Sequence, residues 1–375
     1  MSISFDPVTS RRDLREFIDF PKRLYAHTPQ WVPAFDADYR EFYRGRHPFF
    51  AHAYGGFFLL REDGRPVARV LMIENERYNR QHERRAAHFY FLDFIDREDV
   101  SQELFRGMAQ WAASRGLDEL MGPLFTGATF GAGVLVQGHD LTAAMTMMSY
   151  NHAYYPAHYE AAGFVKHFDL CSLLGDPRSY QLPERVERLA DHVRRRGRLR
   201  VVRFRTKADL RRAAREVGAL YNPTLADHLE NYPLTDQELD RLIEDLLRIA
   251  RPDLEKVITY NDRVIGFMLG FPDLTPAIQA SRGKLTPRTI IALMRESKRP
   301  KRLIFNGMGI LDGFQRIGGN ALIYSELART IAGMPAGFEE AEMVQINEKT
   351  DLMLADLQRL GAEVAKIHRV YRRPV

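Results

Sequence analysis

The sequence predicts two tandem domains of mixed α+β or α/β class, each a mixed, mostly antiparallel twisted sheet flanked by helices. Three observations lead to this fold class. At 375 residues the chain is long enough for two domains of ordinary size. Short β-type runs alternate with amphipathic helical runs, and tight turns join several of the β-type runs. The same order of strands and helices also occurs twice.

Two pairs of landmarks support this repeat. Arg65 and Arg263, each directly after a predicted hairpin turn, are 198 positions apart, and so are Gly163 and Gly361, each directly after a predicted helix. Duplication of one strand–strand–strand–helix–strand–helix–strand unit explains the shared offset. We therefore predict a first domain over 1–175, a connector helix over 176–197 and a second domain over 198–375.

In the first half, Ser10 is expected to cap an opening helix. The run GGFFLLREDGRPVARVLMIEN predicts a hairpin that turns at Asp63-Gly64, and AHFYFLDF predicts a third strand. A helix should follow in SQELFRGMAQWAASRG, from a Ser101 cap to Gly116. A glycine-rich loop then leads to YNHAYYPAHYEAAGF and a last strand, VKHFDLCSLL, before the charged connector helix PERVERLADHVRRRG.

The second half begins with the strand LRVVRF and two helices, KADLRRAAREVGALY and TDQELDRLIEDLLRIA, the second capped by Thr235. A hairpin in EKVITYNDRVIGFMLGFPD should turn at Asn261-Asp262. An insertion, LTPAIQASRGKLTPRTIIALMRESKRP, separates this hairpin from the next strand. The remaining elements are the strand RLIFNGMGIL, the helix GGNALIYSELARTIAG, the strand EEAEMVQI, the helix TDLMLADLQRLGA and the strand EVAKIHRVY.

Composition narrows the cellular setting. A single cysteine, Cys171, allows neither an internal disulfide nor a thiol-rich metal site. The N-terminus lacks the apolar core of a signal peptide, and no later window approaches the length of a membrane span. We expect a cytoplasmic protein. Its net charge of +5 comes mainly from arginine, and the arginine clusters permit peripheral contact with the inner face of the membrane. A solvated basic helix face is the alternative, and it is the preferred interpretation of these clusters. DNA is not an expected partner, because aromatic residues do not alternate with these arginines.

The stretch DGFQRIGGNALIYSELA places an arginine and two glycines directly before a helix-like run. A pyrophosphate needs several backbone N–H donors that converge on one point, and a strand that turns sharply into a helix supplies them. The alternative is a left-handed turn before an ordinary amphipathic helix. Other nucleotide motifs are absent from the sequence: it has no Walker loop and no dinucleotide glycine motif followed by an acid. Its histidines show no metal-ligand spacing, so no metal is expected.

These residues resemble the GNAT superfamily of N-acetyltransferases. The Arg/Gln-x-x-Gly-x-Gly/Ala motif of that superfamily is matched by Arg316-Ile317-Gly318-Gly319-Asn320-Ala321 between the required strand and helix. The resemblance covers most of the chain as a tandem pair. The elements FPKRLY, TPQWVP and HPFF are similar to a bacterial subgroup of such tandem proteins. The resemblance implies that acetyl-CoA or a longer acyl-CoA binds in the second domain.

The family pattern assigns roles around this acyl-CoA. It implies that Met308, Gly309 and Ile310 pair with the pantetheine amides. It also implies that Ile317, Gly318, Gly319, Asn320 and Ala321 hold the pyrophosphate, while Arg316 adds a positive charge.

Two departures from the family pattern concern the proton donor to the leaving thiolate. The superfamily often has an asparagine at the start of its last helix and a tyrosine further along, but the second half has Thr350 and Leu357 there. In the first half, Asn151 and Tyr159 fit the pattern, yet the phosphate motif is missing. We therefore predict that the first domain has lost CoA and the second has kept it. Packing is the preferred role for the tyrosines of YNHAYYPAHYEAAGF.

The acceptor side is expected in LYNPTLADHLENYPLT, between the first two helices of the second half. Tyr221, Asn222, Asn231 and Tyr232 are its candidate substrate-binding residues, and a plain helix–helix loop is the alternative. Candidates for the general base are Asp273, at the end of the second hairpin, and Glu230. Asn306 is a candidate to bind the water of the base or the thioester oxygen.

The function that follows is an acyl-CoA-dependent acyltransferase with a small-molecule or lipid amine as acceptor. A large or lipidic amine, such as a sphingoid base, is one specific version. One alternative is an aminoacyl-tRNA-dependent transferase of the tandem peptidoglycan-bridge type. The other is a non-catalytic acyl-CoA-binding protein. The sequence does not indicate an oligomeric state.

Overall fold

A computed structural model of the chain describes residues 2–125, 130–177, 182–225, 230–333 and 338–375. Contacts divide it into two compact units, which are described separately. Unit 1 comprises Met1–Cys171, Thr275–Leu293 and Ala365–Val375, and unit 2 comprises Ser172–Leu274 and Met294–Val364.

This division differs from the predicted boundaries in three segments. Thr275–Leu293 and Ala365–Val375 were expected in the second domain and belong to unit 1, while residues 172–175 were expected in the first domain and belong to unit 2. In the first segment, the Gly283 carbonyl accepts the Asp36 N–H at 2.8 Å. In the second, the Lys366 ammonium donates to the Thr142 carbonyl at 2.8 Å. Such long-range contacts have no signal in the local pattern of the sequence.

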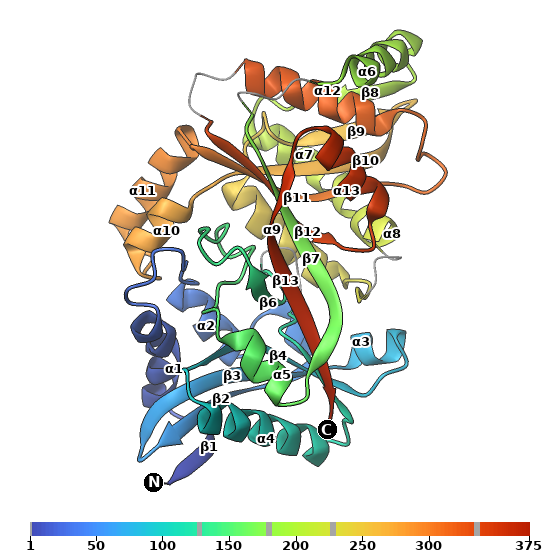
Figure 1. The fold of residues 1–375 in the computed structure, drawn as a ribbon. Coiled ribbons are helices and arrows are strands. Elements are labelled where there is room, and N and C mark those ends of the chain that lie inside the picture. Colours follow the sequence, from blue (N-terminus) through green and yellow to red (C-terminus); the bar gives the residue numbers. More distant parts are fainter. Residues whose placement is uncertain (1, 126–129, 178–181, 226–229, 334–337) are drawn as a thin grey trace. The chain divides into compact units, whose positions relative to one another are not determined.

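The sheet of unit 1 has the strand order β1-β2-β3-β4-β5-β13-β7, and β6 pairs with β13. β4 and β5 run parallel, while β1–β2, β2–β3, β3–β4 and β5–β13 are antiparallel (Figure 1). The predicted mixed, mostly antiparallel sheet is therefore confirmed. Its elements are β1 (Ile3–Pro7), α1 (Arg11–Leu24), α2 (Asp36–Tyr43), η1 (Pro48–Ala51), β2 (Ala53–Glu62), β3 (Arg65–Asn75), α3 (Glu76–Gln81), β4 (Ala86–Phe94), α4 (Glu98–Ser114), β5 (Glu119–Gly122), β6 (Val134–Gln137), α5 (Tyr155–Ala161), β7 (Val165–Gly175), α10 (Thr275–Ser281), most of α11 (Pro287–Lys298) and β13 (Glu363–Pro374).

The core of unit 1 lies between this sheet and the helices α4 and α5. Leu104 and Phe105 of α4 are completely buried against the sheet, together with Tyr159 of α5. A buried ion pair lies within the sheet, where Arg69 Nε of β3 is 2.7 Å from an Asp93 carboxylate oxygen of β4. The same guanidinium connects the sheet to α1, because it donates to the Phe17 carbonyl.

Local signals predicted most boundaries in unit 1. Ser10 forms a capping box with Asp13 at the start of α1. The β2–β3 hairpin turns at Asp63 and Gly64, both in the left-handed region. The Ser101 cap was wrong, because α4 begins three residues earlier and the Ser101 hydroxyl donates to the Glu98 carbonyl inside the helix. Strand β1 was not predicted, because four alternating residues are a weak signal.

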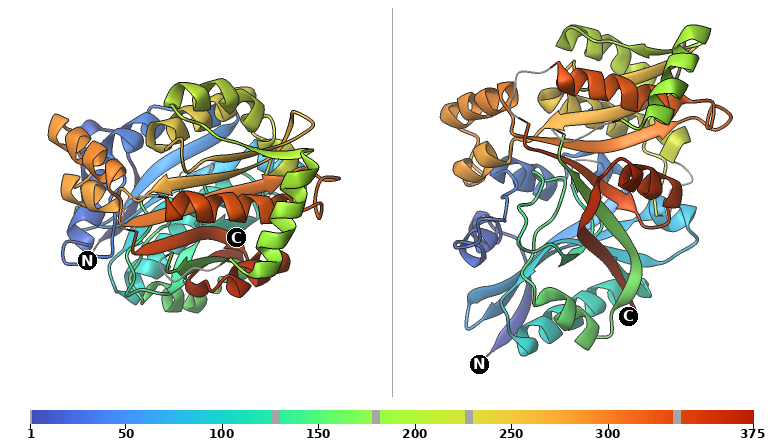
Figure 2. Two further views of the ribbon diagram at one scale, coloured as in Figure 1. Left: turned by 90° about the horizontal axis from the view of Figure 1, so that it is seen from above. Right: turned by 45° about the horizontal axis from the view of Figure 1, so that its top comes forward.

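Unit 2 has the strand order β7-β12-β11-β10-β9-β8, with β11 and β12 parallel. In Figures 1 and 2, α6 and α12 lie side by side on one face of this sheet, and α7 and α9 cover the other face. Its elements are α6 (Glu184–Arg196), β8 (Leu199–Val202), α7 (Lys207–Gly218), α8 (Tyr221–Leu225), α9 (Asp236–Ile249), β9 (Lys256–Tyr260), β10 (Arg263–Pro272), β11 (Arg302–Ile310), α12 (Gly319–Ala332), β12 (Glu340–Asn347) and α13 (Asp351–Arg359).

The predicted turns and caps of unit 2 are present. Thr235 forms a capping box with Glu238 at the start of α9, and Asn261 and Asp262 turn the β9–β10 hairpin with positive φ. The predicted connector contains α6, which is an integral part of unit 2. Its Arg194 guanidinium donates to Ser325 Oγ on α12 at 3.1 Å.

Candidate functional site

The candidate site of unit 2 begins where β11 separates from β12. The parallel ladder between the two strands runs from Arg302↔Glu340 to Phe305↔Met343. Met308, Gly309 and Ile310 lie beyond its last pair and are half-buried. Their backbone groups on the β12 side are therefore available to pair with a ligand, as the family pattern implies for the pantetheine amides.

A bulge in β11 accompanies this separation. The register with β10 shifts between Met268↔Met308 and Gly270↔Phe305, so that Asn306 and Gly307 oppose Leu269 alone. Gly307 has a φ of 115°, which favours glycine. Asn306 is 6% exposed within the bulge. The structure thus places Asn306 beside the residues predicted for the pantetheine, although its predicted role stays a prediction.

The predicted pyrophosphate residues form the turn into α12 and its first turn. Gly318 is the N-cap residue, and its position provides no side-chain hydrogen bond to the helix. The N–H groups of the first turn are therefore free of a side-chain cap, and the positive end of the helix dipole is available to an anion. Arg316, Ile317 and Asn320 are exposed around this end. This geometry suits the predicted phosphate cradle.

The two glycines allow close packing at the start of α12. A Cβ on Gly318 would lie 2.5 Å from Val193 Cγ2 of α6, and one on Gly319 would lie 3.0 Å from Ile310 Cδ1. Gly318 also has a φ of 96°. The glycines therefore let α6 and β11 approach the start of α12. Phosphate access depends on the exposed residues beside them.

An ion-pair network holds α6 against α12. Glu326 of α12 is almost fully buried and receives Arg203 at 2.7 Å and Arg194 at 3.3 Å. Arg329 of α12 pairs with Glu187 of α6 at 2.8 Å. The network fixes the direction of α12, and with it the position of the predicted phosphate cradle at its N-terminus.

Asp273 lies at the opposite end of β11 from the cradle. Its carboxylate accepts Arg302 Nε at 2.9 Å, and Arg302 also pairs with the buried Glu342 at 3.0 Å. Arg302 is the first residue of β11, so Asp273 is roughly 20 Å along the strand from Met308–Ile310. A carboxylate held in a structural ion pair at this distance is poorly placed to act as the base.

The other predicted polar residues are near the loop after α8. Glu230, the other candidate base, is half-buried with a φ of 72°. Asn222 exchanges two 2.9 Å hydrogen bonds with the backbone of Leu234, and the Tyr232 hydroxyl donates to Glu238 at 2.9 Å. These hydrogen bonds favour the alternative interpretation of the segment as an ordered helix–helix loop.

The remaining two substrate candidates differ in their surroundings. Asn231 is exposed at the surface. Tyr221 lines an apolar pocket between α7, α9 and the sheet, and burial raises its pKa to about 12. His228, a further polar residue of the same stretch, lies outside the described residues.

In both units, the position where the GNAT pattern often has a proton-donating tyrosine holds a buried residue. Leu357 of α13 is 7% exposed. In unit 1, Tyr159 is fully buried, burial raises its pKa well above the usual value, and its hydroxyl has no hydrogen-bond partner among the described residues. Asn151 exchanges hydrogen bonds with the Leu135 backbone at 2.7 and 3.1 Å. Full burial of Tyr159 and the backbone hydrogen bonds of Asn151 are typical of residues that serve packing.

The helix of unit 1 that corresponds to α12 carries acids at its N-terminus. Glu98 and Asp99 occupy the first turn of α4, and the preceding Arg97 pairs with Asp99 and Glu62. Fixed negative charges at this end would repel a pyrophosphate. This arrangement supports the prediction that the first domain does not bind CoA.

Sequence reasoning missed Glu255 and the apolar pocket around it. The pocket forms only when α7 and α9 pack on β9 and β10, so no local pattern reveals it. The charged pair Glu255-Lys256 before the apolar strand VITY is the one sequence signal, because buried charges are rare.

In the part of the chain that the structure describes, no group of three or more His, Cys, Asp or Glu side chains is arranged to hold a metal ion. None of the helices in that part of the chain has both the length and the apolar composition needed to cross a bilayer.

Solved structures with the same architecture identify the fold. A tandem GNAT protein from the clavulanic acid biosynthesis pathway superposes with a TM-score of 0.56 and 12% identity, covering 100% of this chain and 98% of the other. The chain has a tandem GNAT fold. A GCN5-related N-acetyltransferase from Anabaena variabilis has the same fold, with a TM-score of 0.51, 9% identity and coverage of 99% and 72%.

Two sequence relatives extend over the whole GNAT tandem. Protein YghO of Escherichia coli is 26% identical over 377 residues, covering 98% of this chain and 94% of the relative. The bacterial ceramide synthase of Caulobacter vibrioides is 26% identical over 381 residues, covering 99% and 97%. No family model matches the chain.

Proposed function

We propose that the protein transfers an acyl group from a CoA thioester to an amine. The uncapped N-terminus of α12 beside the separated end of β11 carries this proposal, because it offers backbone donors to both the pyrophosphate and the pantetheine. The relative from Caulobacter vibrioides is named a ceramide synthase. A ceramide is an N-acylated long-chain amine, so this name supports an amine acceptor.

In the proposed reaction the amine nitrogen attacks the thioester carbon, the new C–N bond forms and the C–S bond breaks. CoA leaves as the thiolate, the amine nitrogen loses its proton to solvent, and the thiolate takes up one proton in return. We assign the contact with the thioester oxygen to Asn306, which lies in the β11 bulge beside Met308. Leu357 cannot supply the proton, and solvent near the exposed Gly307 is its proposed source.

Turnover can be measured directly. We expect the purified protein to release free thiol from acyl-CoA only when a suitable amine is added, with the matching amide detected by mass spectrometry. A panel that combines short and long acyl-CoAs with short and long amines would identify which acyl donor and which amine acceptor react. Binding of CoA without any turnover across this panel would instead favour the non-catalytic alternative.

We also propose that α11 contacts an anionic membrane surface. Leu285, Ile290, Ile291 and Met294 are large apolar residues that are 47–57% exposed on and just before this helix. Arg295 and Lys298 occupy its last turn. Apolar side chains beside basic ones suit the boundary between acyl chains and anionic headgroups. A lipidic acceptor would be found at such a surface.

Replacing Ile291 with Asp should reduce co-sedimentation with phosphatidylglycerol-containing vesicles about tenfold, because an apolar contact is lost and a like charge is added. Vesicles of phosphatidylcholine alone are the control lipid, and Leu352→Asp, at a 74% exposed apolar residue of α13, is the matched control protein. Equal sedimentation of Ile291→Asp and the unmodified chain would remove α11 from the membrane contact.

A further inference from the structure

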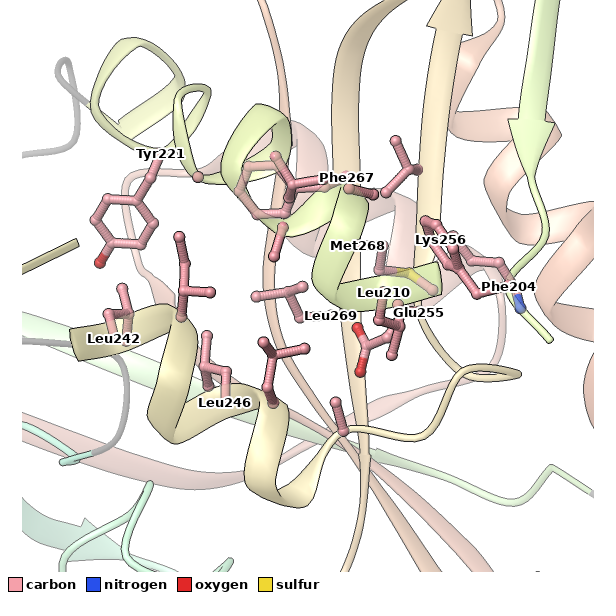
Figure 3. Close-up of a pocket in the computed structure, with 18 of the residues that line it drawn as sticks. Phe204, Leu210, Tyr221, Leu242, Leu246, Glu255, Lys256, Phe267, Met268 and Leu269 are labelled. Atoms are coloured by element: carbon pink, nitrogen blue, oxygen red, sulfur yellow. The ribbon is translucent and has the colours of Figure 1, made fainter. Parts of the chain in front are cut away.

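An apolar pocket lies in unit 2 between α7, α9 and the strands β9 and β10 (Figure 3). Its empty volume is about 670 Å³, and this figure includes space that is open to solvent. Apart from Glu255, Lys256 and the Tyr221 hydroxyl, its lining side chains are hydrocarbon or thioether groups, including Leu246 of α9 and Leu269 of β10.

Glu255 is the unusual member of this lining. It is 5% exposed, and its Oε1 atom is buried without a hydrogen-bond partner in the described structure. Its Oε2 atom accepts only a long bond, 3.4 Å, from the Gly270 N–H. Burial raises the pKa of this carboxyl well above the usual value, because the charged form is poorly solvated there. An unpartnered buried polar atom is costly unless a ligand satisfies it.

Figure 3 shows the Glu255 carboxyl directed into the space between α7 and α9. Neighbouring Lys256 attracts this carboxyl electrostatically, but its ammonium donates to the Asp253 carbonyl, and Oε1 is left without a hydrogen bond in the described structure. Oε1 is therefore open to a polar group that enters the pocket from outside the described chain.

The pocket also adjoins the separated end of β11. A Cβ on Gly307 would lie 3.4 Å from Leu269 Cδ1 and 3.9 Å from Phe267 Cε2, and both of these side chains line the pocket. A Cβ on Gly309 would meet Thr224 Oγ1 of α8 at 2.7 Å. A substrate chain attached to a reacting group at the bulge thus has an apolar space directly behind the strand.

We propose that this pocket holds one long alkyl chain of a substrate, and that Glu255 Oε1 receives a hydroxyl group carried by that chain. The inference rests on the proposed function, because the chain is assigned to the acyl donor or to the amine acceptor. The apolar lining recognises the methylene groups, and the unpartnered Oε1 atom recognises the hydroxyl.

Calorimetric titrations separate the inference from the function on which it rests. Titration with CoA alone tests whether the predicted phosphate cradle binds CoA. The series acetyl-, hexanoyl-, dodecanoyl- and hexadecanoyl-CoA tests a chain on the donor, and alkylamines of the same lengths test a chain on the acceptor. In one of the two series, affinity should rise about fourfold for each added methylene until the pocket is filled. Failure of CoA to bind would overturn the proposed function alone.

Variants connect any chain-length effect to this pocket. Ala214 lines it from α7, whereas Ala208 of the same helix is exposed and outside the lining. Ala214→Phe should abolish the gain from long chains and leave CoA affinity unchanged, while Ala208→Phe should change neither. Long chains that bind equally well to both variants would overturn the pocket assignment.

The hydroxyl is tested by comparing chains of equal length with and without a hydroxyl at successive positions. At one position the hydroxylated chain should bind about fivefold more tightly. In Glu255→Leu this preference should disappear while the plain chain binds more tightly than before. A preference that persists in Glu255→Leu, or that appears at no position, would overturn the role of Glu255.

Discussion

Asn320→Glu is expected to weaken CoA binding at least about tenfold without lowering the stability of unit 2. Asn320 is exposed at the second position of α12, beside the predicted pyrophosphate site. A carboxylate there would repel the pyrophosphate. It would also interact favourably with the helix dipole, by about 0.5 kcal/mol, so loss of binding would not reflect unfolding. Isothermal titration with CoA and thermal unfolding of the same samples measure both effects.

Two control variants test whether a negative charge at this position causes the loss of CoA binding. Asn320→Gln keeps an amide at the same position and should retain CoA affinity. Gln237 is the exposed second residue of α9, so Gln237→Glu adds the same charge at the equivalent position of another helix in unit 2. It should leave CoA binding unchanged. If Asn320→Glu and Gln237→Glu bind CoA equally well, the pyrophosphate is not at the start of α12.

Sequence reasoning succeeded where a local pattern determines the structure. The turn at Asp63-Gly64 and the Thr235 cap depend on the backbone preferences of two to four neighbouring residues, and both are present. The start of α12 after β11 was predicted in the same way. The fold class followed from the order of such elements, since a repeated order with short connections leaves few possible topologies.

The same reasoning failed where contacts between segments far apart in the chain determine the structure. The closeness of Val193 to Gly318 depends on how α6 packs against α12, and residues 125 positions apart in the chain carry no local signal of it. Asp273 seemed suitable as a base because it ends a strand, but Arg302 on the next strand occupies its carboxylate. The pocket around Glu255 likewise requires two helices and two strands to assemble.

Unit 1 is expected to lose about 4 kcal/mol of stability between pH 7.5 and pH 5. His88 and His368 are buried in its sheet, 4% and 0% exposed. Burial lowers the pKa of His88 to about 3 and that of His368 to about 4. His368 Nε2 donates to the Ser149 carbonyl at 2.9 Å, and its Nδ1 has no hydrogen-bond partner in the described residues.

The direction of this effect follows from proton linkage. Above pH 6.5 both histidines are neutral in the folded and the unfolded chain, and they do not affect stability. Below pH 6.5 the unfolded chain binds two protons that the folded chain excludes, and each costs about 1.4 kcal/mol per pH unit. For His368 the loss continues down to about pH 4. Urea unfolding can follow it, because both tryptophans, Trp31 and Trp111, are in unit 1.

One substitution should remove half of the pH dependence. Gln at position 368 places an amide N–H near the former Nε2 position, so His368→Gln can keep the bond to Ser149 without titrating. The loss between pH 7.5 and pH 5 should then fall to about 2 kcal/mol. His27 is exposed on unit 1, and His27→Gln should retain the full loss. An unchanged pH dependence in His368→Gln would mean that carboxylates, rather than the excluded histidine proton, control the acid stability of unit 1.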